Sequence, residues 1–411
     1  MSVQAESAQL RSGWARVSGP RAIGIVGIGL GALSFWLALP PTQARSVVVP
    51  VAVGIVGAAA GIWAASRQER RVGWGAIVAA LLGIAGAILA TRSSITHLHV
   101  VVFWGALVTA TLRWATPLTF AAIGGMFSER SGVVNIGLEG MMLMGAFFGA
   151  LGADKTGSWE GGLLIAMAAG GALALVHAFF AIHLRADQIV GGTAINFLAL
   201  GITGYLYVNV YGVGGTPTNL PEIPDVHIGW LGHVPPHQVG SFLENAFGQM
   251  NLMVWLMFPL LIVSYIVMFK TPIGLRIRSV GEHPRAAETV GISVYAVRYS
   301  AVVVSGVLAA LGGAYLSIGF VHSFSEGMTN GRGFIALAAL IFGGWRPFGA
   351  FGAALLFGFS SAVALRLPDA YGSSAGTLFQ ALPYVLTLIA VAGVIGRSIP
   401  PAAIGRPYKK Q

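Results

Sequence analysis

The sequence of 411 residues contains no cysteine and very little charge. The absence of cysteine excludes disulfide bonds and thiolate metal sites. Only 9% of the residues are Asp, Glu, Lys or Arg, and none of the four lysines lies in the GxxxxGK[ST] pattern of a phosphate-binding loop. The N-terminus has no short apolar region followed by a cleavage site, so we expect no removable signal peptide.

Apolar residues make up 55% of the chain, above the ~45–50% that is typical of soluble domains. The 58 glycines suit close helix packing in lipid, where small residues let backbones approach one another. The net charge of +10 comes from basic residues in short loops between apolar runs. This pattern indicates membrane orientation rather than nucleic-acid binding.

Apolar runs of about 20 residues predict transmembrane helices. With a cytoplasmic N-terminus, 18 Lys and Arg residues fall on the cytoplasmic side and five fall outside, which favours cytoplasmic N- and C-termini. We expect the shortest run to be a brief crossing shielded from lipid by neighbouring helices. The predicted spans are 21–40, 47–65, 73–91, 99–125, 136–153, 161–183, 189–211, 251–269, 298–320, 333–345, 347–366 and 378–396.

Polar side chains interrupt the apolar stretch SERSGVVNIGLEGMMLMG, which runs from Ser128 to Gly145. A carboxylate such as Glu139 costs roughly 2.5–3.5 kcal/mol in hydrocarbon, so it is expected to face a bundle interior or a cavity. Its neighbours Asn135 and Met142 lie on the same helix face. Two interpretations remain open for the polar residues of these helices: hydrogen bonds between helices, or a polar substrate path with an aromatic face. The candidate path residues are Asn135, Glu139, Thr193, Asn196 and Phe197, with Gln188 as a further buried polar group.

The longest predicted cytoplasmic connection runs from Lys270 to Arg298. Pro284 suits the first position of a helix and Gly291 suits its C-terminal cap, which predicts about two helical turns between them. Arg285 and Glu288 can pair at i, i+3. Such a helix is either one turn in a solvated loop or a docking element for another protein, with a small apolar face formed by Ala286, Ala287 and Val290.

Together these two stretches resemble the nucleoside branch of the sugar-type permease subunits of bacterial ATP-binding-cassette importers. Ribose-type relatives carry a GG-I-D-L-S-V-G pattern where this chain has the residues Ser131–Gly140. The family's coupling helix follows a G-x-N/H-P-x-A-A-x-x-x-G-I pattern, which this chain matches from Gly281 to Ile292, with His283 where Asn is commoner. The resemblance covers roughly residues 100–400.

The resemblance implies an all-α polytopic membrane protein with about 12 transmembrane helices and the inverted repeats of type II importers. Residues 132–145 and 331–344 form a faint internal repeat. Residues 1–98 would be an N-terminal extension with three spans, and residues 99–411 the permease core, with its coupling loop at 270–298. ATP hydrolysis would come from a separate chain, so the subunit itself would be no enzyme and would need no cofactor. The implied partners are an ABC ATPase subunit, a second homologous permease subunit, an extracytoplasmic substrate-binding lipoprotein and membrane lipid, in the bacterial cytoplasmic (inner) membrane.

Two predicted outer loops are candidates for contact with the binding protein. The first, 212–250, is rich in Pro and Gly, and its histidines have no carboxylate partners at helical spacing that would indicate a metal site. The second, from Phe324 to Phe334, contains Glu326 and Arg332. These two residues either pair with each other or dock the binding protein by charge.

Other functions remain open alongside a nucleoside permease. A related permease for a simple sugar or nucleobase would share most of these features. An ion-coupled secondary transporter would also carry buried carboxylates and inverted repeats, but it has no use for a small-residue docking helix. A membrane enzyme would need a His, Asp and Glu cluster at one depth, which the sequence lacks.

Overall fold

A computed structural model describes residues 19–37, 47–92, 104–212, 215–217, 219–235, 237–366 and 399–409. The chain forms two compact units, Met1–Trp104 and Gly105–Gln411. The predicted division at residue 98 and the inverted repeat remain predictions.

Three helices form the first unit: α2 (Gly19–Leu37), α3 (Val48–Ser66) and α4 (Arg70–Arg92). They pack pairwise through small residues, and a Cβ atom at Gly31 would collide with the backbone of Ala79 and Ala80. The buried Ser34 donates a hydrogen bond to the Pro50 carbonyl at 2.8 Å. Large apolar side chains point outward, including Leu82 at 68% exposure, as expected of a helical unit in lipid.

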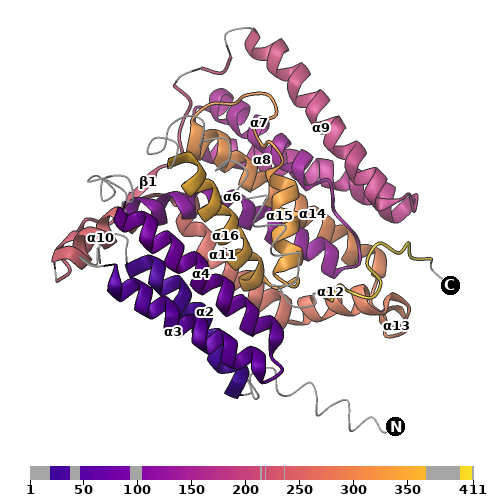
Figure 1. Ribbon diagram of the computed structural model, residues 1–411. Coiled ribbons are helices and arrows are strands. Elements are labelled where there is room, and N and C mark those ends of the chain that lie inside the picture. The colour runs from indigo at the N-terminus through magenta and orange to yellow at the C-terminus, as the bar shows by residue number, and fades with distance from the viewer. Residues whose placement is uncertain are drawn as a thin grey trace, which may run out of the picture. The chain divides into compact units, whose positions relative to one another are not determined.

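The second unit is built around α14, which packs against α7 and α8 (Figure 1). Glycines allow this close approach, because a Cβ atom at Gly145 would collide with Ala310 and one at Gly313 with the Met142 carbonyl. The π-helical turns η1 and η4 extend α8 and α14, and α9 lies beside α7. The described helices are α6 (Trp104–Arg130), α7 (Leu138–Thr156), α8 (Trp159–Ala178), η1 (Phe179–His183), α9 (Gln188–Tyr211), η3 (Gly229–His233), α10 (His237–Phe247), α11 (Leu252–Lys270), α12 (Pro272–Glu282), α13 (Pro284–Thr289), α14 (Val294–Ala314), η4 (Tyr315–Val321), α15 (Arg332–Phe342) and α16 (Pro347–Arg366).

The predicted outer loop 212–250 is partly ordered by a small sheet. Strand β1 (Asp225–His227) pairs antiparallel with β2 (Gln249–Asn251), with Val226 opposite Met250. Helices η3 and α10 lie between the two strands in sequence. The other regular elements in the described part of the protein are helices, which confirms the predicted all-α membrane fold.

Seven described helical segments are long and apolar enough to cross a membrane: Val48–Ser66, Gly105–Arg130, Trp159–His183, Gln188–Tyr211, Leu252–Lys270, Val294–Val321 and Pro347–Leu365. Shorter apolar helices occupy 22–35, 72–88 and 332–342. The predicted span 378–396 lies outside the described residues. The run predicted at 333–345 contains α15, whose 11 residues reach only about 16 Å, roughly half of the hydrocarbon thickness.

Candidate functional site

The chain between α6 and α7 is not helical, although it lies inside the protein. Residues 131–137 include the fully buried Ser131, Val133 and Asn135. Gly132 has a φ of +94°, in the region that glycine adopts without strain, and a Cβ atom there would lie 2.8 Å from the Arg298 guanidinium. Non-helical backbone at membrane depth requires partners from the surrounding protein. We call residues 131–137 the signature segment.

Side chains from three other helices form hydrogen bonds with the backbone and side chains of the signature segment. The Val134 amide donates to Gln188 Oε1 of α9 at 2.8 Å, and the Val134 carbonyl lies 3.1 Å from His177 Nε2 of α8. Asn135 Nδ2 donates to the Ser305 hydroxyl of α14 at 2.8 Å. All four of these side chains are buried, so the contacts fix the segment within the helix bundle.

Asn196 of α9 joins the end of the signature segment to the start of α7. Its Nδ2 donates to the Ile136 carbonyl at 3.0 Å, and its Oδ1 accepts from the Gly140 amide at 2.8 Å. A single side chain therefore supplies both the donor and the acceptor that this break in the helix needs.

Glu139 caps the N-terminus of α15, a helix that lies almost 200 positions further along the chain. Its two carboxylate oxygens accept from the amides of Gly331 at 2.8 Å and Gly333 at 2.6 Å. A carboxylate is favoured here by the free N–H groups and by the helix dipole. Gly331 has a φ of +80° and Gly333 lies against the Glu139 backbone, so both positions require glycine. This geometry agrees with the interpretation of Glu139 as a link between helices.

The other end of α15 is held by residues just before the signature segment. Trp345 Nε1 donates to the buried Glu129 carboxylate at 2.5 Å, and Arg130 Nε donates to the Trp345 carbonyl at 3.1 Å. Residues 129–139 thus contact both ends of α15. A helix of half the membrane thickness ends inside the protein, so both of its termini need such partners.

The five candidate path residues fall into two groups. Asn135, Glu139 and Asn196 are brought together at the signature segment by the contacts above. Thr193 and Phe197 lie on the exposed face of α9, where Phe197 is 69% exposed. The Thr193 hydroxyl donates to the Ile189 carbonyl of its own helix at 2.9 Å.

Three buried side chains at the signature segment each retain one polar atom without a hydrogen-bond partner in the described structure. These atoms are Asn135 Oδ1, His177 Nδ1 and Gln188 Nε2. Buried polar atoms are normally paired with protein or water, so these three unpaired atoms are exceptions within the described residues. An amide oxygen, an amide NH₂ and an imidazole nitrogen can recognise a neutral hydroxylated molecule without carrying charge themselves.

Helix α13 has the predicted ends, with Pro284 in its first turn and Gly291 just beyond it at a φ of +81°. Its faces differ from the prediction. Ala286 and Val290 are exposed, but Ala287 is only 3% exposed because it packs against Val280, Val294 and Tyr408 of its own chain. Ala287 therefore does not share the exposed apolar face.

The carboxylate of Glu288 also has a partner that the sequence analysis did not identify. It accepts from the Tyr408 hydroxyl, and the described residues contain no ion pair between Glu288 and Arg285. The i, i+3 spacing permits that pair, but the C-terminal segment supplies a better-placed donor.

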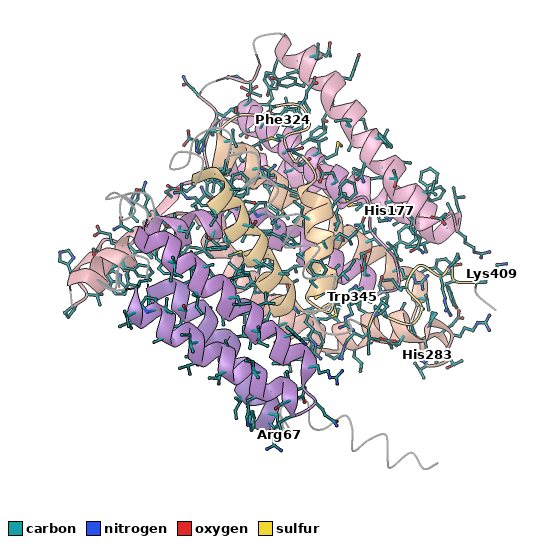
Figure 2. All side chains as sticks on the ribbon, in the orientation of Figure 1. Arg67, His177, His283, Phe324, Trp345 and Lys409 are labelled. Carbon is teal, nitrogen blue, oxygen red and sulfur yellow. The ribbon has the colours of Figure 1, made fainter. Side chains whose placement is uncertain are left out.

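The second predicted outer loop is held in place by its own backbone and by aromatic contacts. Arg332 donates to the Met328 carbonyl at 2.8 Å and stacks over the Trp114 ring at 4.9 Å, and it forms no ion pair with Glu326 within the described residues. Glu326 is exposed. Phe324 at the start of this loop and His283 at the coupling loop lie at opposite ends of the second unit (Figure 2).

His177, Ser305 and Arg298 are partners of the signature segment that the sequence does not predict. A lone histidine and a serine on apolar helices carry little local signal. Arg298 was counted only as a cytoplasmic charge, yet it is 1% exposed and its Nε donates to the Ser131 carbonyl at 3.2 Å. Among the described residues no three His, Asp or Glu side chains gather in a way that would hold a metal ion.

Comparison with known sequences identifies relatives over most of the second unit. The model of a family described as the permease component of branched-chain amino acid transport systems matches residues 107–391. The guanosine ABC transporter permease NupQ of Bacillus subtilis is 44% identical over 314 residues, which are 74% of this chain and 96% of NupQ. The nucleoside ABC transporter permease NupC of Lactococcus lactis is 39% identical over 313 residues, 74% of this chain and 96% of NupC.

A third relative carries a different substrate in its name. TsgC13 of Haloferax volcanii, provisionally named as a glucose ABC transporter permease, is 36% identical over 264 residues, 64% of this chain and 78% of TsgC13. No solved structure matches the chain.

Proposed function

This chain belongs to the family of permease components of branched-chain amino acid transport systems, and from that premise we propose that it is the permease subunit of an ABC importer for nucleosides. The 44% identity to a guanosine permease, over 96% of that relative, is the observation that carries the choice of substrate. The protein is a multi-pass membrane protein of all-α fold. The proposed location is the bacterial cytoplasmic membrane, with both termini in the cytoplasm.

The proposed path runs along the signature segment. A nucleoside is neutral, with hydroxyls on the ribose and donors and acceptors on the base. The unpaired atoms of Asn135, His177 and Gln188 match that chemistry. Glu139 and Asn196 position the segment. Thr193 and Phe197, on the exposed face of α9, would line the path where that face meets the second permease subunit. An importer that receives its cargo from a binding protein needs only weak contacts along this path.

Each proposed partner would bind a different surface of the second unit. An ATPase subunit would dock on α13, with Pro284 and Gly291 defining its ends and with Ala286, Val290 and the exposed Arg285 in contact. Ala287 and Glu288 hold α13 to its own chain from behind. A binding lipoprotein would dock at the opposite end, on Glu326, with Arg332 supporting the loop. A second permease subunit and lipid would cover the large apolar side chains that α9 leaves exposed.

Uptake in cells that lack their own nucleoside transport tests the substrate. The chain is expressed with its ATPase, second permease and binding protein, and the uptake of labelled guanosine, guanine, ribose and glucose is measured. We expect guanosine uptake that unlabelled nucleosides inhibit and the free base and sugars do not. Uptake of glucose alone or of guanine alone would show that the substrate is a sugar or a nucleobase rather than a nucleoside. Uptake that a protonophore abolishes at an unchanged ATP level would indicate a secondary transporter.

Single-cysteine labelling tests the proposed orientation, because the natural chain has no thiol. We expect cysteines at Ser241, in α10, and at Ser279, in α12, to react with an impermeant maleimide from opposite sides of the membrane. Labelling of both positions from the same side would contradict the proposed topology between them.

A further inference from the structure

The C-terminal segment Ile399–Lys409 is bonded to the coupling loop. The Ala402 amide donates to Glu282 Oε2 at 3.1 Å, and the Ala403 amide donates to the Gly281 carbonyl at 2.9 Å. Figure 1 shows this yellow segment running beside α12 and α13. The segment is therefore a structural part of the loop rather than a free tail.

Tyr408 fixes the end of this segment against α13. Its ring is 5% exposed, lies edge-on to Tyr295 with the ring centroids 5.7 Å apart, and packs against Ala287. Burial, and then the hydrogen bond that Tyr408 donates to the Glu288 carboxylate, raise the pKa of Tyr408 to about 12. The phenol therefore stays protonated at physiological pH and continues to donate this hydrogen bond.

The same segment is also bonded to the region of the signature segment. The Gly405 amide donates to the Gly132 carbonyl at 3.1 Å. The buried Arg298 donates through Nη1 to the Arg406 carbonyl at 3.1 Å and through Nε to the Ser131 carbonyl. The backbone of residues 402–408 is thus fixed on two sides, while the side chains of Arg406 and Lys409 remain exposed.

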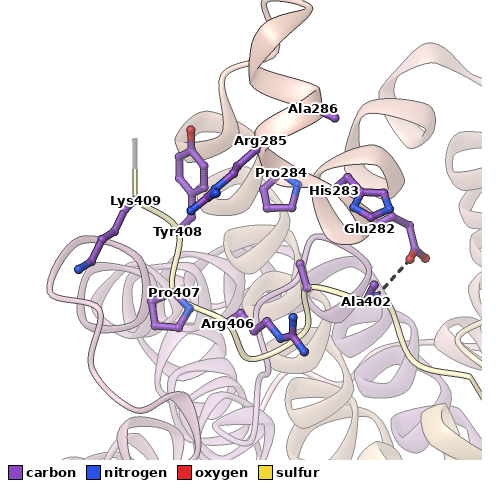
Figure 3. Close-up of a pocket in the computed structure, with 11 residues that line it drawn as sticks. Glu282, His283, Pro284, Arg285, Ala286, Ala402, Arg406, Pro407, Tyr408 and Lys409 are labelled. Atoms are coloured by element: carbon purple, nitrogen blue, oxygen red, sulfur yellow. Dashed lines mark hydrogen bonds between the residues drawn. The ribbon is translucent and has the colours of Figure 1, made fainter. Parts of the chain in front are cut away.

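Beside these contacts, an open groove of about 710 Å³ is lined by residues of this segment and of α13 (Figure 3). One wall carries His283 and Arg285, and the other carries Arg406, Pro407 and Lys409. The cations Arg285, Arg406 and Lys409 form no ion pair within the described residues.

The groove carries net positive charge. Its lining contains one carboxylate, Glu282, which already accepts from the Ala402 amide. Three exposed cations on two facing walls match a negatively charged occupant, and arginine is suited to bind carboxylates with two hydrogen bonds.

We propose that this groove receives an acidic segment of the ATPase subunit, so that the C-terminal segment forms the second half of the docking surface. The inference rests on the proposed function, because α13 is both one wall of the groove and the proposed docking helix. Ala286 of α13 itself lines the groove, so a protein that docks on Ala286 also reaches the groove. Charge complementarity across such an interface sets both the association rate and its dependence on salt.

Charge reversal in the assembled complex tests this inference. In the double variant Arg406→Glu, Lys409→Glu, only side chains change, and the backbone contacts of Arg406 with Arg298 and Ala403 are available as before. We expect binding of the ATPase subunit to the purified permease complex in neutral-lipid nanodiscs to weaken at least tenfold, and its dependence on salt to decrease. The control is Arg67→Glu, Arg70→Glu, an equal charge change at two exposed residues of the first unit, which should bind as the natural chain does.

Three results would overturn the inference. The first is binding of the groove variant within twofold of the control. The second is a defect that appears only in nanodiscs with anionic lipid, because the occupant would then be a lipid headgroup. The third is a weakened variant that also melts earlier than the control, combined with normal binding by Arg406→Gln, Lys409→Gln, because the loss would then come from misfolding.

Ala286→Arg separates this inference from the proposed function. Ala286 lies on the exposed face of α13, so a bulky cation there should block docking whether or not the groove takes part. Normal ATPase binding by Ala286→Arg would contradict the proposed docking on α13 itself. Loss of binding in Ala286→Arg, with normal binding in the groove variant, would contradict only the role of the C-terminal segment.

Discussion

The two units of this protein use different chemistry to pack their helices. In the first unit, small residues bring unbroken helices together, and the buried polar side chain Ser34 bonds to a single carbonyl. In the second unit, the buried side chains of His177, Gln188 and Ser305 bond to a chain that is not helical. An unbroken helix pairs its backbone N–H and C=O groups within itself. Where a helix is interrupted, these groups need hydrogen-bond partners from neighbouring segments. The polar network therefore marks the place where the helical structure of the second unit is interrupted.

The boundary of the family match agrees with this contrast. The match begins at residue 107, directly after the first unit ends at Trp104. The part of the chain that the family model matches is thus the part that contains the non-helical signature segment. We expect mutations of polar groups in the second unit to abolish transport, and comparable mutations in the first unit to change stability only.

The largest effect is expected from Glu139→Ala. This change leaves the amides of Gly331 and Gly333 without an acceptor, at a cost of about 1–3 kcal/mol for each buried group. We expect poor assembly of the complex and loss of uptake, measured as the yield of purified complex and as guanosine uptake. Glu139→Gln keeps one acceptor but sets an NH₂ group against the second amide, so it should assemble to an intermediate extent. Normal assembly of both variants with loss of uptake would instead indicate contact with substrate.

A matched pair of substitutions to alanine, one in each unit, compares the two units directly. Asn135→Ala removes the partner of the Ser305 hydroxyl, and Ser34→Ala removes the donor to the Pro50 carbonyl. Each loses one buried hydrogen bond to oxygen, worth about 0.5–1.5 kcal/mol, and Asn135→Ala also loses the weaker contact of Nδ2 with Met141 Sδ at 3.4 Å. We expect similar small losses of thermal stability, but a decrease in uptake of at least tenfold for Asn135→Ala only. Equal uptake by the two variants would remove the functional distinction between the units.

The smallest effect is expected from deletion of residues 1–98, which leaves α6 complete. The core should still assemble, and guanosine uptake per assembled complex should stay within twofold of the full chain. A complex that assembles normally but fails to transport would show that the N-terminal helices act directly in uptake.

Much of the fold follows from local sequence. Length and apolarity define a span within some 20 residues, so every predicted span that falls within the described residues contains a helix. Pro284 and Gly291 likewise predict the ends of α13 because helix boundaries depend on residues at those boundaries. Helix α12 was not predicted within the coupling loop, since its 11 residues are too few and too polar to stand out as a span.

The partners within the site depend on contacts between distant segments. Glu139 bonds to residues 192 and 194 positions away, and Glu288 bonds to Tyr408, 120 positions away. Helical periodicity placed Ala287 beside Ala286 and Val290, but it carried no information on the C-terminal segment that covers Ala287. Sequence identified which polar residues were unusual, and the fold determined what each of them binds.

ATP-driven uptake in proteoliposomes tests the central claim most directly. The complex of this chain with its ATPase, second permease and binding protein is reconstituted without any ion gradient, and labelled guanosine is supplied on the side of the binding protein. The account predicts that guanosine accumulates only when ATP is present on the ATPase side, and that an inactive ATPase subunit abolishes the accumulation. Accumulation without ATP hydrolysis, or hydrolysis that guanosine and its binding protein do not stimulate, would contradict it.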